Sequence, residues 1–118
     1  MVLVDTSVWV DHLRGKPSQL AELLEEGSVV CHPFIIGELA CGNIRNRDEI
    51  LDLLQALPLA TSADHAEVLH LLQENRIYGR GLGWVDAHLL ASAMLSGCSL
   101  WTRDKSLATV AGEFHQSY

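Results

Sequence analysis

Short runs of aliphatic and β-branched residues alternate along this chain with longer segments of helical periodicity, and this alternation restricts the fold strongly. Strand-like runs lie at residues 2–5, 28–31, 58–60 and 98–102. Between them, apolar residues recur every three or four positions, as in helices that pack by one face. Short strands separated by helices favour a parallel sheet with right-handed crossovers and helices on its faces. The 118 residues therefore predict one α/β domain over residues 1–118, a three-layer α/β/α arrangement with a short parallel sheet.

Helix boundaries follow from caps and breakers along the chain. Thr6 or Ser7 can cap the first helix, Pro17 suits the first turn of the second, and glycines end several segments. The expected helices cover residues 7–14, 17–26, 33–41, 47–56, 63–77 and 86–96, with a last one from about residue 104. The glycine-rich segment 79–83 lacks a phosphate-binding pattern and is predicted to be a flexible loop.

Four acidic residues stand within or directly after apolar sequence, namely Asp5, Glu38, Asp86 and Asp104. Ligands of parallel α/β sheets gather beyond the carboxyl ends of the strands, and Asp5 and Asp104 follow strand-like runs. If the four carboxylates meet, their repulsion requires a compensating charge. Carboxylate oxygens are the ligands that hard cations such as Mg²⁺ or Mn²⁺ take. The pattern therefore predicts a divalent metal site formed by these four residues.

Each of these acids also has a purely structural interpretation. Asp5 and Asp104 are good helix caps, and Asp86 lies in a first helical turn, where the helix dipole favours an anion. Glu38 is harder to explain in this way, because its helical neighbours are apolar and it is predicted to point along a buried face. Those neighbours are Phe34, Ile35 and Cys41.

The charge balance is unfavourable for a nucleic-acid partner. The net charge is −7, and it stays acidic even if a metal compensates the four acids. Arg103 and Lys105 flank Asp104, and Arg45 and Arg47 form another small pair. These cations are either local phosphate contacts or solvated surface charges.

Other features exclude some classes of protein. The three cysteines have no recognisable spacing and are expected to be buried, reduced thiols, and the histidines have no zinc-ligand pattern. No apolar stretch reaches the length of a membrane helix, and we recognise no signal peptide, so we expect a cytoplasmic protein without membrane contact. The three tryptophans are expected to pack in the core or at its edge, and only one exposed beside the site could stack on a base.

Four segments around the four acids form a recognisable set, namely Leu3–Ser7, Ile36–Leu39, Val85–Ala91 and Leu100–Asp104. Together they resemble the PIN-domain ribonucleases, and most closely the VapC toxins of bacterial toxin–antitoxin pairs. They occur in the order and at the separations of that family, and the resemblance spans nearly the whole chain.

This resemblance implies a Mg²⁺- or Mn²⁺-dependent endoribonuclease that cleaves RNA with a metal-activated water. It also implies a homodimer that is inhibited by a cognate antitoxin. The acidic site would consist of Asp5, Glu38, Asp86 and Asp104, with Thr6 and Thr102 as supporting hydroxyls. Arg103 and Lys105 are the candidate RNA contacts.

Two other functions remain open from the sequence. An aspartyl-phosphate phosphatase would also place an aspartate after the first strand, but such enzymes resembling the haloacid dehalogenases have a second aspartate where this chain has Ser7. A non-catalytic module that binds RNA or an antitoxin is the alternative within the same fold. Four mutually repelling charges argue against it, because binding alone does not require them.

Overall fold

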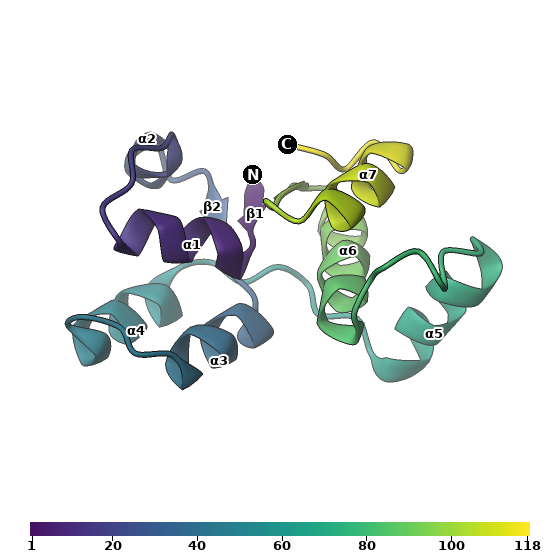
Figure 1. Ribbon diagram of the computed structural model, residues 1–118, viewed down its shortest axis with the longest axis horizontal. Coiled ribbons are helices and arrows are strands. Elements are labelled where there is room, and N and C mark those ends of the chain that lie inside the picture. The colour runs from purple at the N-terminus through teal and green to yellow at the C-terminus, as the bar shows by residue number, and fades with distance from the viewer.

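The computed structural model describes residues 1–118 and has three short parallel strands between helices (Figure 1). The strands β1 (Val2–Val4), β2 (Val29–Val30) and β3 (Ser99–Trp101) form a sheet in the order β2-β1-β3. Val2 is in register with both Val29 and Ser99, so the first strand of the chain is the central one. The predicted α/β class with a short parallel sheet is confirmed.

Seven helices connect and cover the strands. They are α1 (Thr6–Leu13), α2 (Leu20–Glu25), α3 (Pro33–Cys41), α4 (Arg47–Ala56), α5 (His65–Glu74), α6 (Trp84–Ser96) and α7 (Lys105–Glu113). The predicted bounds of α3 and α4 agree with the structure. None of these helices is both long enough and apolar enough to cross a membrane.

Two predicted elements are wrong in part, namely the strand at residues 58–60 and the helix at residues 17–26. Residues 58–60 do not form a strand, because only Leu59 makes a bridge, to Cys31 just after the two-residue strand β2. The second helix begins at Leu20, because the hydroxyl of Ser18 accepts the Leu20 N–H and Pro17 stays outside the helix.

The helix α5 is shorter than predicted at both ends. Asp64 and Glu67 form a reciprocal capping box that starts the helix at His65. The helix ends at Glu74, and Arg76 then takes a left-handed conformation with φ of 52°. Local side-chain bonds and this turn therefore determine its length, rather than the apolar spacing.

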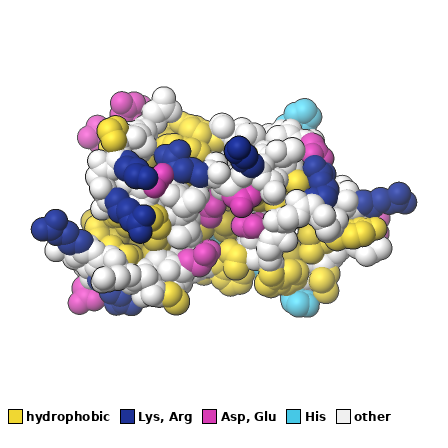
Figure 2. All heavy atoms as spheres, in the orientation of Figure 1, with side chains coloured by type: hydrophobic (Ala, Val, Ile, Leu, Met, Phe, Trp, Pro, Cys, Tyr) yellow, Lys and Arg dark blue, Asp and Glu magenta, His cyan; other side chains and the backbone are white.

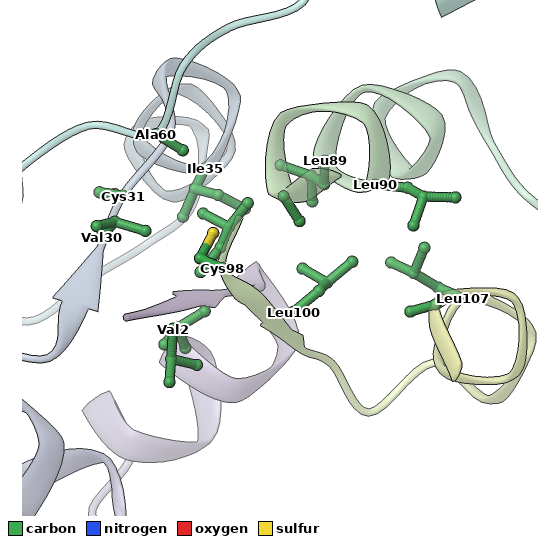
Figure 3. Packing of buried hydrophobic residues seen from close by; sticks show 14 of the residues in the cluster. Val2, Val30, Cys31, Ile35, Ala60, Leu89, Leu90, Cys98, Leu100 and Leu107 are labelled. Carbon is green, nitrogen blue, oxygen red and sulfur yellow. The ribbon is translucent and has the colours of Figure 1, made fainter. Parts of the chain in front are cut away.

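The apolar core lies on both faces of the sheet. Figure 3 shows α1 below β1, whereas Ile35 of α3 and Leu89 of α6 lie above it, and Leu90 and Leu107 face each other beside Leu100. All five of these labelled side chains are fully buried. Helices on both faces fix the sheet, and with it the edge at which the strands end.

The cysteine prediction holds for two residues of three. Cys31 and Cys98 are buried thiols, and burial raises the pKa of each. Cys41 is exposed at the end of α3, because its side of the helix faces away from the core that Ile35 and Leu39 enter.

Candidate acidic site

The four predicted acids come from four different elements that meet at the carboxyl ends of the strands. Asp5 directly follows β1, Asp104 precedes α7, Glu38 lies in α3 and Asp86 in the first turn of α6. The charge of Asp5 raises the pKa of both Glu38 and Asp86, and Asp104 also raises that of Asp86. Figure 2 shows acidic side chains gathered near the middle of this face. The structure therefore brings the predicted set together.

Asp5 is the most firmly held of the four, and only 8% of it is exposed. Its Oδ1 accepts the Thr6 N–H at 2.8 Å, which caps α1. Its Oδ2 accepts the hydroxyls of Thr102 at 2.7 Å and Ser7 at 3.3 Å. The prediction that Thr6 or Ser7 caps α1 is thus corrected, because the cap is Asp5 itself.

The same network continues into the turn between β3 and α7. The Thr102 hydroxyl, which donates to Asp5, accepts the Asp104 N–H at 3.1 Å. Asp104 in turn caps α7 by accepting the Leu107 N–H at 2.9 Å, and Asp104 itself is exposed. The structural interpretation of Asp5 and Asp104 as helix caps is therefore confirmed, and each cap is also a member of the acidic cluster.

Asp86 is positioned by the start of α6. The helix begins at Trp84, two residues earlier than predicted, with Gly83 as its cap. The Gly83 N–H donates to Asp86 Oδ2 at 3.0 Å, which fixes the half-buried carboxylate. Burial is the main cause that raises the pKa of Asp86, followed in the same direction by Asp5 and Asp104, while the Gly83 bond opposes the rise.

Glu38 differs from its predicted environment. The residue is exposed, and so are Phe34 and Cys41, whereas Ile35 and Leu39 enter the core. The apolar neighbours on the helix surround Glu38 without burying it, so the predicted buried face is wrong. The pKa of its carboxyl is still raised, chiefly because part of it is withdrawn from water and then because of Asp5 and Asp86.

Hydroxyl groups lie beside the acids, and one of them was not predicted. Thr102 bonds to Asp5 directly. The Thr6 side chain lowers the pKa of Glu38, although its buried hydroxyl has no partner of good hydrogen-bond geometry. Ser7 was not predicted, yet its hydroxyl donates to Asp5 and accepts the Arg103 N–H at 3.2 Å. Its position next to Asp5 and Thr6 in the first motif was the available signal.

The two candidate RNA contacts are not equivalent. The Arg103 guanidinium is 2.5 Å from Asp11, which also binds Lys16 at 3.3 Å. Lys105 is exposed and forms no ion pair. Arg103 would have to leave Asp11 to contact a phosphate, whereas Lys105 would not.

The glycine-rich segment 79–83 is fixed against α7. Arg80 forms a bidentate ion pair with Glu113. A Cβ atom at Gly81 would lie only 2.9 Å from the Ser106 hydroxyl. Gly81 also has a φ of 88°, which favours glycine. The loop is confirmed, but it is tethered and not free.

Aromatic rings form a row that starts on the same two helices as Glu38 and Asp86. His88 packs its ring edge-on against Phe34 at 4.8 Å and against Trp84 at 4.7 Å. Trp84 is 39% exposed, whereas Trp9 is buried in the core as expected. His32 continues the row beneath Phe34, and burial, with a smaller effect of His88, lowers the pKa of His32 to about 4.

The chemistry of the cluster fits a hard divalent cation. All four donors are carboxylates, two of them have pKa values raised by burial and then by their acidic neighbours, and the buried Thr6 hydroxyl has no partner. As the side chains stand, no three of them are close enough to ligate one ion together. The donor set is therefore suited to the metal in kind, and its side chains would have to adjust to hold it.

Comparison with known proteins agrees with this architecture. The chain matches the PIN domain family over residues 2–113. It is 51% identical over 114 residues to Ribonuclease VapC32 from two strains of Mycobacterium tuberculosis, CDC 1551 / Oshkosh and ATCC 25618 / H37Rv. The match covers 96% of this chain and 92% of the relative.

Proposed function

The chain belongs to the PIN-domain family and is of the VapC type, and from this premise we propose that it is a divalent-metal-dependent endoribonuclease, the toxin of a toxin–antitoxin pair. The observation that carries the proposal is the group of four carboxylates at the sheet edge, where partial burial and then the charge of Asp5 raise the pKa of both Glu38 and Asp86. Repelling charges at one place reduce stability, so a function that requires them has to be sought. Cleavage of a phosphodiester at a cation-binding site is such a function.

In this proposal Asp5, Glu38, Asp86 and Asp104 hold the cation and act in catalysis. A bound Mg²⁺ or Mn²⁺ supplies charge that polarises a phosphate oxygen and makes water more acidic. Asp5 has a fixed orientation because three donors hold its two oxygens. Thr102 supports Asp5 in this way, and the Thr6 side chain lies beside Glu38 and lowers the pKa of its carboxyl.

Glu38 and Asp86 are the candidates to accept a proton from the attacking water. Their raised pKa values make them better proton acceptors than an ordinary carboxylate. Glu38 is exposed and accepts no hydrogen bond from the backbone, so its carboxylate can turn toward a water, whereas Asp86 is tied to Gly83. We assign the proton transfer to Glu38 on this difference.

RNA is the substrate of this proposal, and a cognate antitoxin and a second copy of the chain are its protein partners. Lys105 and, after release from Asp11, Arg103 would contact the RNA. A hollow of about 540 Å³ between α5 and α6 has an apolar lining that includes Ala66, Leu71 and Met94, and it supports an interface between two copies. Sedimentation at micromolar concentration tests this, because a 13.0-kDa species alone contradicts the homodimer. We place the activity in the cytoplasm, where RNA and antitoxin are available.

Cleavage of total RNA by the purified chain, with and without cation, tests the proposal. We expect cleavage with Mn²⁺, none in excess EDTA, and recovery when Mn²⁺ is restored. The Asp86→Asn chain, purified in the same way, controls for contaminating nucleases and should not cut. Equal cleavage in EDTA would exclude the metal-dependent mechanism, and RNA that is bound but never cut would support the non-catalytic module.

A further inference from the structure

A groove leads from the acidic site between α1 and the loop that connects α3 to α4. Its volume is about 270 Å³, and its lining mixes polar and apolar side chains, whereas the hollow between α5 and α6 is mainly apolar. Thr6 and Glu38 line the end that belongs to the acidic site. Arg14, Asn43 and Arg45 are the polar residues of the rest, where apolar side chains such as Leu13 and Ile44 complete the lining. We call it the Arg14–Arg45 groove.

The two arginines of the groove have no acidic partner within the chain. Four of the eight cationic side chains are in ion pairs, namely Lys16, Arg47, Arg80 and Arg103. Arg14 and Arg45 are exposed and belong to the unpaired half. In a chain with a net charge of −7, two unpaired guanidinium groups on one groove form a local site for anions.

The backbone that carries these arginines is fixed by other contacts. The Arg47 guanidinium donates to the Ala40 carbonyl at 2.8 and 3.3 Å and so closes the loop that contains Arg45. Arg14 ends α1, and its backbone N–H bonds to the carbonyls of Val10 and His12. Neither anchor uses the side chain of Arg14 or Arg45, so both remain available to a ligand.

We propose that the Arg14–Arg45 groove binds the RNA backbone next to the scissile phosphate, with one phosphate on each arginine. The inference rests on the proposed function, since it takes RNA as the substrate of the acidic site. The groove shares Thr6 and Glu38 with that site, so a strand lying in it continues directly to the acids. The arginines attract the polyanion close to a cluster that repels it when no cation is bound.

Binding should therefore depend on salt through these two residues. Each phosphate neutralised on a single strand contributes about 0.7 to the slope of log affinity against log salt. Loss of both arginines should reduce that slope by about 1.4 and weaken binding by about 25-fold at 0.1 M salt. The backbone anchors predict that Arg14→Ala and Arg45→Ala leave the circular dichroism spectrum unchanged.

The test measures binding of a labelled single-stranded RNA of twelve nucleotides by fluorescence anisotropy over a range of salt. All chains carry Asp86→Asn so that the RNA stays intact. Arg14→Ala, Arg45→Ala and their combination are compared with Arg76→Ala, a matched control that removes an exposed, unpaired arginine outside the groove. We expect the first three to lower affinity and salt slope and the control to change neither.

Two results would overturn the groove assignment. One is an Arg14→Ala/Arg45→Ala chain that binds RNA with unchanged affinity and salt slope. The other is an equal loss in the Arg76→Ala control, which would indicate a diffuse charge effect. RNA would also be rejected as the occupant if a polyglutamate peptide displaced the labelled RNA more effectively than unlabelled RNA does. This displacement would have to depend on Arg14 and Arg45 in the same way.

Failure of the ribonuclease proposal would look different. Chains with Asp86 intact are assayed in parallel for cleavage of the same RNA with Mn²⁺. If they cut it while the arginine variants bind normally, only the groove assignment fails. If they never cut it, the ribonuclease proposal fails, and the anisotropy data still decide whether the groove binds RNA.

Discussion

The two halves of the acidic site are built on opposite principles. On the strand side, Asp5 and Asp104 accept hydrogen bonds from backbone or hydroxyl donors and cap the helices α1 and α7. On the helix side, Glu38 and Asp86 have pKa values raised by partial burial and by their acidic neighbours. Only the Gly83 N–H bonds to this pair, at Asp86. The strand half contributes to the fold, whereas the raised pKa values of the helix half mean that its charged carboxylates are disfavoured when no cation is present.

This difference predicts that the four acids do not respond alike to substitution. Loss of Asp5 should damage both stability and activity, since its carboxylate joins the turns after β1 and β3. Loss of the charge at Glu38 should damage activity alone. Four changes, from the largest expected effect to the smallest, test the contrast.

The largest effect concerns cleavage by variants of the helix half. Glu38→Gln and Asp86→Asn remove charge at nearly constant size, and each should lower cleavage of RNA by about 100-fold or more. Single-turnover cleavage with Mn²⁺ measures this, and circular dichroism checks that the fold is retained. Full activity in either variant would remove that residue from the proposed mechanism.

The second effect concerns stability of the strand half. Asp5→Ala removes the cap of α1 and leaves the Thr102 and Ser7 hydroxyls without their acceptor, which should cost about 2 kcal/mol. The melting temperature without metal should therefore fall by about 6–12 °C. Asp104→Ala removes a cap at a more exposed position, so its melting temperature should fall by about half as much. A melting temperature of Asp5→Ala equal to that of the wild type would contradict the structural role of Asp5.

The third effect is the response to a divalent cation. Binding to the folded chain alone stabilises it by RT ln(1 + [L]/Kd), about 1.4 kcal/mol at ten times Kd. Thermal unfolding with Mn²⁺ should show this rise in the wild type and a smaller rise in Glu38→Gln and Asp86→Asn. No rise in the wild type at millimolar Mn²⁺ would count against a cation site.

The smallest effect is a gain in stability when the repulsion at Glu38 is removed. Glu38→Gln should raise the metal-free melting temperature at pH 7 by about 1–4 °C, because Gln resembles the protonated carboxyl. The pKa of Glu38 is raised in the folded chain, so the folded state binds its proton more tightly than the unfolded state. Wild-type stability therefore falls relative to the variant as the pH rises from the ordinary glutamate range through this raised pKa.

The difference between the two chains should thus vanish under acidic conditions and become constant above the raised pKa. Melting curves of both chains in EDTA, from acidic to neutral pH, measure it directly. Glu22→Gln, at an exposed acid of α2, is the matched control and should show no such change. A melting temperature of Glu38→Gln below that of the wild type at pH 7 would show that the carboxylate is stabilising.

The comparison of halves also explains what the sequence could predict. Asp5 and Asp104 follow from topology, because residues just after parallel strands meet at one edge. The orientation of Glu38 did not follow, because α3 is apolar on nearly all sides and its periodicity does not distinguish the covered side from the open one. The same ambiguity led to the wrong expectation for Cys41, which is exposed.

Errors in the fold likewise occurred where local bonds outweigh pattern. Residues 58–60 have strand composition but make one bridge to Cys31, because β2 ends there. Ser18 and Asp64 start α2 and α5 through side-chain bonds that apolar spacing does not reveal. The Arg14–Arg45 groove joins residues from separate elements, so only the folded chain brings its two unpaired cations together.

The central position of β1 has a consequence for how the protein is made. Asp5 leaves the ribosome well before its partner Thr102, which lies 97 residues further along the chain. The strand that completes the sheet, β3, arrives only shortly before Thr102. A nascent chain therefore has no assembled site until more than 100 residues have been translated. The proposed ribonuclease would thus be unable to act on RNA while most of its chain is still being synthesised, and the proposed antitoxin could be supplied in that interval.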